Sequence, residues 1–250
     1  IDSNLNSLVT SDLQEAAAIS NRIARSCTIA VGGETLGIVG ATTPELATLS
    51  SPGGAVVLTN VAAEVQGAVD ALTNAGIDKI ILLAHLQQVE NEIALAGQLR
   101  GVDVIIAGGS HALMAKPGDR LRTGDVRYGD YPVATNDLDG QPVYVLNTAA
   151  NYRYVGRFVA DFDAGGAISG VSALSGAYAT DDQGVIDAGN HAPAAAVTNV
   201  VGLLAGIIDA KDGNLFGRTS VYLNGIRESV RTEETNLGDL TADANLYRGR

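Results

Sequence analysis

The stretch from Lys79 to His111 limits the possible folds of this chain more than any other. Within it, Ile80 to Leu83 and Val102 to Ile106 are short runs rich in Ile, Leu and Val. Such runs are typical of strands that are buried on both faces of a parallel sheet. Between them, apolar residues recur at helical spacing from Val89 to Leu99. The stretch is therefore predicted to form a strand, a helix and a second, parallel strand.

A histidine follows each of these two predicted strands. His85 follows the first directly, and His111 follows the second after Ala107-Gly108-Gly109-Ser110. In open α/β sheets, ligands bind outside the carboxyl ends of the strands. A single histidine in such a place is usually an ordinary polar surface residue, but imidazole is also the commonest metal ligand among side chains. Two histidines at adjacent strand ends favour a shared site.

The remaining patterns divide the chain into a parallel part and an antiparallel part. Before Lys79, we predict strands at 28–31 and 36–42, joined by a turn at Gly32-Gly33, and a helix that ends near Asn74. After His111, residues 116–130 are predicted to be a surface loop. Antiparallel strands are then predicted at 131–135, 143–147, 154–162 and 168–175. The predicted fold class is α/β, in a mixed α+β arrangement.

The last third of the chain has a different character. Residues 178–189 are polar and acidic and are predicted to be a linker, and residues 193–210 are predicted to be a helix. Asn224-Gly225 predicts a hairpin between 220–223 and 227–230, and Asn236 is predicted to cap a final helix. A hairpin and one helix cannot bury a core alone, so this segment is predicted to open a second domain.

Composition excludes several classes of protein. The net charge is −12, so general binding to nucleic acid is not expected. Cys27 is the single cysteine, which excludes an internal disulfide and a cysteine-based zinc site. No apolar run approaches the ~20 residues of a membrane span. The aromatic and basic residues at 152–154 are interpreted as an edge-strand cluster rather than a binding patch.

The run IILLAHLQQ…LAGQLRGVDVIIAGGSH resembles the 5′-nucleotidase branch of the calcineurin-like metallophosphoesterases. In that family, a histidine follows one buried strand and a Gly-Gly-His-Ser/Thr-His motif follows the next. The segment YPVATNDLDGQPVYVLNTAANYRYVGRFVADFDAGG resembles the last strands of the family's catalytic domain. The segment NGIRESVRTEETNLGDLTADANL resembles the start of the family's carboxyl-terminal substrate-recognition domain.

The resemblance implies a fold and a domain organisation. The fold would be the second half of a four-layer α/β/β/α sandwich, followed by a linker helix and the start of a second α/β domain. Residues 1–178 would be the carboxyl-terminal portion of the catalytic domain. Residues 179–213 would be the linker with its helix, and residues 214–250 the beginning of the substrate-recognition domain.

The resemblance also implies a partial metal site. His85 matches a ligand of the second of two divalent metal ions, such as zinc or manganese, and His111 matches a ligand of the first. Gly109 stands where the family has another histidine ligand, and glycine offers no side-chain donor. The family's Asp-x-His, bridging Asp, Asn-His-Glu/Asp motif and catalytic histidine are not found, so no catalytic residue is identified. Gly189-Asn190-His191 is interpreted as a coincidental match.

The function implied by the resemblance is metal-dependent hydrolysis of a phosphate monoester, such as a nucleoside 5′-phosphate, outside the cytoplasm. The partner would be a small nucleotide or phosphate ester. Because most ligands are absent, we expect the 250-residue chain to be a fragment that is inactive alone. An alternative is a non-catalytic surface or binding protein that keeps the fold with a degenerate metal site, which Gly109 favours. A dinucleotide-binding protein ranks last, because no Gly-x-Gly-x-x-Gly follows a strand.

Overall fold

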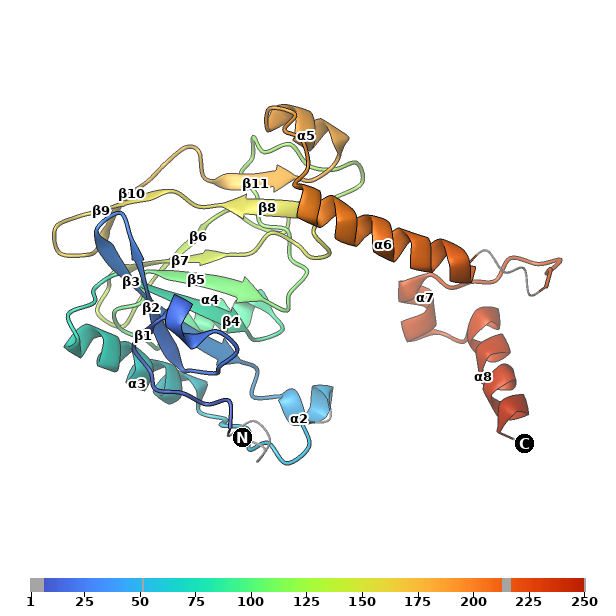
Figure 1. The fold of residues 1–250 in the computed structure, drawn as a ribbon, viewed down its shortest axis with the longest axis horizontal. Helices are drawn as coiled ribbons and strands as arrows, with labels where there is room; N and C mark the ends of the chain where they lie inside the picture. Colours follow the sequence, from blue (N-terminus) through green and yellow to red (C-terminus); the bar gives the residue numbers. More distant parts are fainter. Residues whose placement is uncertain (1–6, 51, 213–216, 250) are drawn as a thin grey trace. The chain divides into compact units, whose positions relative to one another are not determined.

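The computed structural model describes residues 7–50, 52–212 and 217–249. The chain divides into two compact units, Ile1–His191 and Ala192–Arg250 (Figure 1). The first unit is an α/β structure built around one large mixed sheet, and the second unit consists of helices. This confirms the predicted fold class. The division into domains at residues 178 and 213 remains a prediction.

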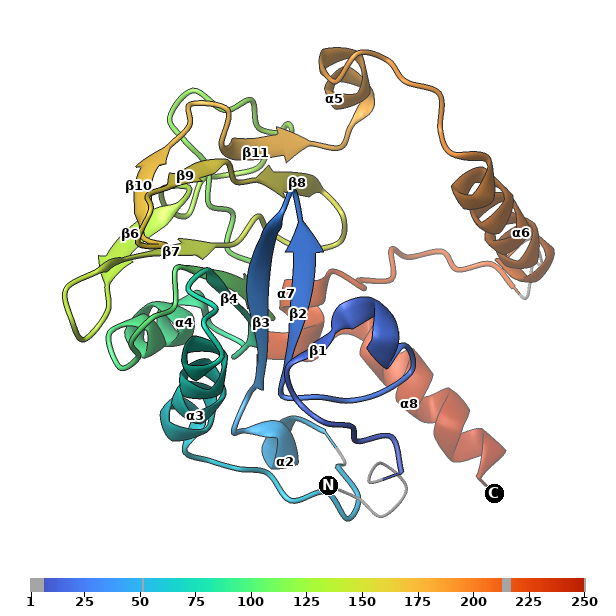
Figure 2. The same cartoon turned by 60° about the vertical axis from the view of Figure 1, so that its left-hand side comes forward.

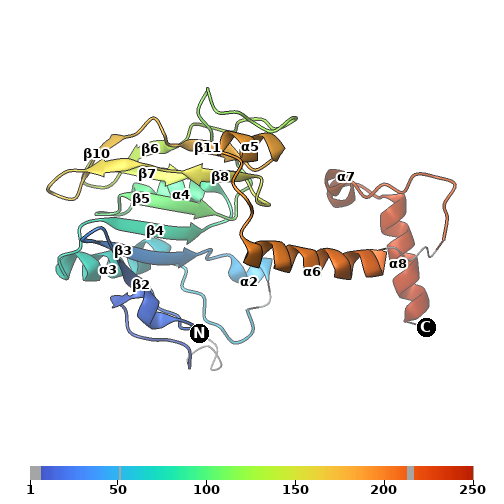
Figure 3. The same ribbon diagram turned by 45° about the horizontal axis from the view of Figure 1, so that its top comes forward.

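The large sheet contains seven strands in the order β1-β2-β3-β4-β5-β7-β6. Strands β3, β4, β5 and β7 run parallel and lie side by side (Figure 3), while β2 and β6 pair antiparallel with β3 and β7. Gly32 and Gly33 form the predicted turn between β2 and β3, both with positive φ. The bounds are β1 Gln14–Glu15, β2 Ser26–Val31, β3 Glu34–Thr42, β4 Ile80–His85, β5 Val104–Gly108, β6 Val133–Asn136 and β7 Pro142–Leu146.

Two helices cover one face of this sheet. Helix α3 (Val61–Asn74) packs against β3, and α4 (Val89–Ala96) packs against β5, β6 and β7 (Figure 2). Asn60 caps α3 by accepting a hydrogen bond from the Ala63 N–H. Alternate residues of the strands point into this helix layer. The predicted strand–helix–strand unit is confirmed, since β4, α4 and β5 follow one another and the two strands are parallel. The core there includes Leu72, Ile80, Leu82, Val89, Leu99, Ile105, Val143 and Val145.

The opposite face of the sheet is only partly covered. The antiparallel pair β9 (Ala160–Phe162) and β10 (Ile168–Val171) packs against it, and the Phe158 ring lies 5.5 Å from the Tyr144 ring on β7. Further along the same face, Leu83 and Ile106 are 46% and 45% exposed. Parallel sheets are normally buried on both faces, so this apolar surface is unusual for the centre of such a sheet.

A second strand pair joins the long loop that follows β5. Strand β8 (Tyr154–Arg157) pairs antiparallel with β11 (Gly176–Ala179). The predicted loop, residues 116–130, contains no helix or strand, and its Asp119 accepts hydrogen bonds from the Lys116 and Ala177 N–H groups. Its Arg120 pairs with Asp181 and Asp187, which lie at and within the short helix α5 (Asp182–Asp187). The Arg120 guanidinium lowers the pKa of Asp181 to about 2.

One detail of the strand prediction was wrong. Residues 154–162 form two strands with different partners rather than one, because Ser175 binds the backbone of Val159. Its Oγ accepts the Val159 N–H at 2.9 Å and donates to the Val159 carbonyl at 3.2 Å, which ends the ladder there. Residues 176–187 form β11 and α5, so part of the predicted linker contains a strand and a short helix.

The second unit contains α6 (Ala195–Asp212), α7 (Arg227–Thr232) and α8 (Asn236–Arg248), while the first unit also holds the short η1 (Ala16–Ile19) and α2 (Leu46–Leu49). The predicted hairpin at Asn224-Gly225 was wrong. Asn236 binds both the Asn224 N–H and the Tyr222 carbonyl at 2.8 Å, so these groups are not free for a partner strand. Thr235, not Asn236, caps α8. Among the described residues, no helix has the length and apolarity needed to span a membrane.

Asp103 lies just before β5 and supports the beginning of β4. Its Oδ2 accepts the Ile80 N–H at 2.7 Å. Burial raises the pKa of the Asp103 carboxyl to about 7, and nearby Asp78 and Asp137 act in the same direction. Lys79 and the Ile80 N–H oppose this rise. The ionised form of Asp103 therefore costs stability at neutral pH.

We expect Asp103→Asn to remove a pH dependence of stability. Because the folded pKa is raised, Asp103 contributes stability below pH ~4 that is lost as pH rises through ~7. Asparagine still offers an acceptor to Ile80 and has no charge to desolvate. The free energy of unfolding of the variant minus that of wild type should increase by about 2–4 kcal/mol between pH 4 and pH 8.

Urea denaturation at both pH values measures this difference. Asp161→Asn serves as the control, because Asp161 lies on β9 with an exposed side chain. Parallel pH profiles for wild type and Asp103→Asn would show that the carboxyl titrates normally.

Candidate functional site

The parallel pairing of β3, β4 and β5 places His85 at the carboxyl edge of the sheet. In the register of these strands, His85 lies opposite Thr42 on one side and Gly108 on the other. Its side chain is exposed. Because side chains alternate along a strand, His85 shares the partly open face with Leu83 rather than the helix-covered face. The structure therefore places His85 at the edge predicted from the sequence.

The His85 ring packs against the backbone of the Gly108-Gly109 turn. Gly109 has φ +88°, a conformation that side chains disfavour. A Cβ atom at Gly109 would lie 2.8 Å from Cδ2 and 2.9 Å from Nε2 of His85, and 3.0 Å from the Cα of Gln87. The imidazole thus fills the space that any side chain at position 109 would need. This contact explains, on steric grounds, why position 109 holds a glycine.

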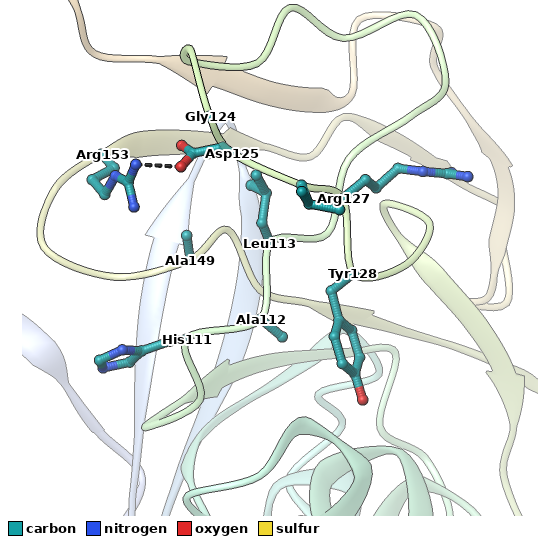
Figure 4. A pocket seen from close by; sticks show the side chains of 10 residues that line it. His111, Ala112, Leu113, Gly124, Asp125, Arg127, Tyr128, Ala149 and Arg153 are labelled. Atoms are coloured by element: carbon teal, nitrogen blue, oxygen red, sulfur yellow. Dashed lines mark hydrogen bonds and ion pairs between the residues drawn. The ribbon is translucent and has the colours of Figure 1, made fainter. Parts of the chain in front are cut away.

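His111 lies on the other side of this turn. Asn147 Nδ2 donates to the Ser110 carbonyl at 3.4 Å, and the Ser110 Oγ accepts the Ala112 N–H at 3.1 Å. These bonds hold the chain that carries His111, whose own side chain is exposed. His111 lines an open pocket of about 460 Å³ together with residues of the loop 116–130 and of the β7–β8 connection (Figure 4).

Asp125, Arg127 and Arg153 of this pocket each have an ion-pair partner. Asp125 pairs with Arg153 and accepts a hydrogen bond from the Tyr154 hydroxyl at 2.8 Å. Arg127 binds Asp130 and extends away from His111 in Figure 4. Burial and the bond to Asp125 raise the pKa of Tyr154. Arg153 and Tyr154 thus bind Asp125 of the loop 116–130.

His85 and His111 leave the same edge of the sheet, but the structure does not gather a complete metal site around them. His85 does not line the pocket that His111 lines. Within the described part of the chain, no group of three or more His, Cys, Asp or Glu side chains is placed to hold a metal ion. A catalytic zinc usually has three protein ligands. The described residues alone therefore do not fit a two-metal centre, and the ligand roles of His85 and His111 remain predictions.

Sequence reasoning missed one polar residue near this edge. Glu92 is completely buried on α4 and accepts the Leu86 N–H at 2.7 Å. Its position, three residues after Val89, puts it on the apolar side of the helix. The sequence offered one indication of this residue, which is a single carboxylate at a position of the helix where apolar residues recur.

We expect Gly109→Ala to destabilise the fold more than a glycine replacement in open space. The left-handed backbone and the contacts with His85 and Gln87 should together cost about 2–4 kcal/mol of unfolding free energy. Gly140→Ala is the matched control, since Gly140 has φ +79° and no atom lies within 4 Å of the place that an added methyl group would take. It should cost about 1 kcal/mol.

The double variant His85→Ala, Gly109→Ala then tests the cause. Removing the imidazole should restore about 1 kcal/mol or more relative to the sum of the single variants. Strict additivity in urea denaturation would show that the ring does not occupy the space at position 109.

The chain is similar in sequence to curated 5′-nucleotidases. It is 34% identical to a 5′-nucleotidase from Diplobatis ommata over 225 residues, which are 89% of this chain and 36% of that protein. It is 32% identical to a snake venom 5′-nucleotidase from Gloydius brevicauda over 235 residues, which are 93% of this chain and 37% of that protein. The chain thus spans little more than a third of these relatives. No protein-family model matches it.

A solved structure shows the same likeness. A 5′-nucleotidase precursor from Thermus thermophilus is 28% identical and superimposes with a TM-score of 0.74, over 96% of this chain and 45% of that one. The sequence and fold similarities run through both units of the chain and include the edge that carries His85 and His111. The chain therefore belongs to the 5′-nucleotidase family.

Proposed function

We propose that this chain is part of a phosphate monoester hydrolase of the 5′-nucleotidase type that acts on a small nucleotide. The observation that carries the proposal is the similarity to curated 5′-nucleotidases, which extends over 89% to 93% of the chain. The position of two histidines at the carboxyl edge of a parallel sheet supports it, because that edge is where ligands bind in open α/β sheets.

In this proposal, the phosphate ester approaches the edge formed by the ends of β4 and β5. His85 and His111 face that side with exposed imidazoles, which can bind a phosphate oxygen or a divalent cation. Dependence on divalent ions such as zinc or manganese is proposed for the whole protein. Such a centre would need donors beyond those of the described residues, because these do not complete one.

The domain organisation and the location are also proposals. Residues 1–178 would belong to a catalytic domain, 179–213 to a linker, and 214–250 to a substrate-recognition domain. The exposed apolar surface at Leu83 and Ile106 supports a further layer on that face of the sheet, as in a four-layer sandwich. A place outside the cytoplasm is supported by the relatives from snake venom.

A non-catalytic binding protein with the same fold is the second candidate. Gly109 favours it, because the glycine removes one family ligand and the His85 ring occupies the freed space. The two candidates differ in whether replacement of His85 or His111 changes a reaction rate or leaves every rate at background.

Phosphate release from AMP tests the proposal, measured on the protein expressed from its complete gene. Loss of a group that contacts the reacting phosphate typically costs ~10²–10³-fold in rate. We therefore expect His85→Ala and His111→Ala to lower the rate of phosphate release by about 100-fold or more. His191→Ala is the control and should retain the wild-type rate, since His191 is exposed at the end of the first unit.

Two outcomes would contradict this account. Background rates in the wild-type protein with several nucleotides, at saturating zinc or manganese, would favour the binding protein. Robust phosphate release by the 250-residue chain alone, abolished by His85→Ala, would overturn the expectation that this chain is inactive by itself.

A further inference from the structure

The residue that follows His85 is held by two side chains of helix α4. Glu92 Oε1 accepts the Leu86 N–H at 2.7 Å, and Asn91 Nδ2 donates to the Leu86 carbonyl at 2.8 Å. Both polar backbone groups of Leu86 are therefore bound by neighbouring residues of one helical turn. The next residue, Gln87, has φ +73°, so the chain turns sharply immediately after this clamp. Leu86 itself is 5% exposed.

Burial of the Glu92 carboxylate at this position lowers the stability of the fold. Glu92 is 0% exposed, and its second carboxylate oxygen, Oε2, has no hydrogen-bond partner among the described residues. Burial raises the pKa of Glu92, and the nearby His85 imidazole opposes the rise. A buried carboxylate with an unpartnered oxygen costs stability. An apolar residue would pack better at this position of α4. Packing therefore does not explain why a carboxylate is found there.

The geometry gives that reason. Strand β4 ends at His85, and the His85 ring is confined on one side by the Gly108-Gly109 turn. Leu86 follows His85 directly and connects the end of the strand to the turn at Gln87. The hydrogen bonds to both polar groups of Leu86 restrain the backbone that follows His85, and the Gly108-Gly109 turn limits the space open to the imidazole on one side.

We propose that Glu92 and Asn91 are positioning residues that fix the His85 imidazole at the carboxyl edge of β4. The purpose of the fixed imidazole, contact with a phosphate ester or its cation, rests on the proposed function. The restraint on the chain beside His85 does not, because both hydrogen bonds to Leu86 are contacts within the chain. The same helix offers a matched comparison in Glu90, whose side chain is exposed.

The test uses the 250-residue chain labelled with ¹³C at histidine. The chain contains three histidines, and single His→Gln variants assign the signal of each. We compare Glu92→Ala, Glu92→Gln, Asn91→Asp and the control Glu90→Gln. Glutamine keeps an acceptor for the Leu86 N–H, whereas alanine does not. Aspartate keeps the shape of Asn91 but cannot donate to the Leu86 carbonyl.

We expect Glu92→Ala and Asn91→Asp to shift or broaden the His85 ring signals and to leave those of His111 and His191 in place. Exchange of the Leu86 amide hydrogen should become about tenfold faster or more in Glu92→Ala, because a hydrogen bond to a charged group is lost. Glu92→Gln keeps an acceptor for the Leu86 N–H, so it should change the His85 signals less than Glu92→Ala does. Glu90→Gln should match wild type in both measurements.

Unchanged His85 signals in Asn91→Asp and in Glu92→Ala would overturn the proposal and leave Glu92 a purely structural residue. If Glu92→Ala does not fold, Asn91→Asp decides, because Asn91 is exposed and its replacement leaves the core intact. Failure of the proposed function is a separate result. In that case the clamp variants still move the His85 signals, but His85→Ala leaves phosphate release from AMP unchanged.

Discussion

The parallel pairing of β4 with β5 is the interaction on which the rest of the site depends. It sets His85 opposite Gly108, so the imidazole lies against the Gly108-Gly109 turn, whose residues have no side chains. A shift of one residue in this register would turn His85 toward the helix layer, where the core is already filled. The same pairing brings His111 out at the same edge, beyond the turn.

Two carboxylates, the half-buried Asp103 and the buried Glu92, hold β4 at both of its ends. Asp103 accepts the N–H of Ile80, the first residue of the strand, and Glu92 accepts the N–H of Leu86, the residue just after it. Burial raises the pKa of both acids. An apolar strand anchored in this way gives up some stability at neutral pH and gains a fixed position relative to its neighbours. A fixed position is what an exposed residue at the strand end requires if it is to meet a ligand.

The main elements of the first unit followed from sequence periodicity, because apolar strands and an amphipathic helix leave plain patterns at 80–85, 89–96 and 104–108. The edge location of His85 and His111 followed from the same patterns. Contacts made by single side chains could not be foreseen. Ser175 divides a continuous strand pattern at Val159, and Asn236 occupies the backbone groups of a turn that otherwise favours a hairpin. The role of Gly109 needed the position of the His85 ring, which no sequence pattern contains.

Family membership does not by itself establish a metal site in this chain. The fold and sequence place the chain in the 5′-nucleotidase family, while the His85 ring leaves no room for a side chain at position 109. The most direct test is a calorimetric titration of the 250-residue chain with zinc and with manganese, alongside His85→Ala. The account predicts no near-stoichiometric binding of either ion. Near-stoichiometric binding that disappears in His85→Ala would contradict it, because His85 would then belong to a metal centre that the described residues assemble by themselves.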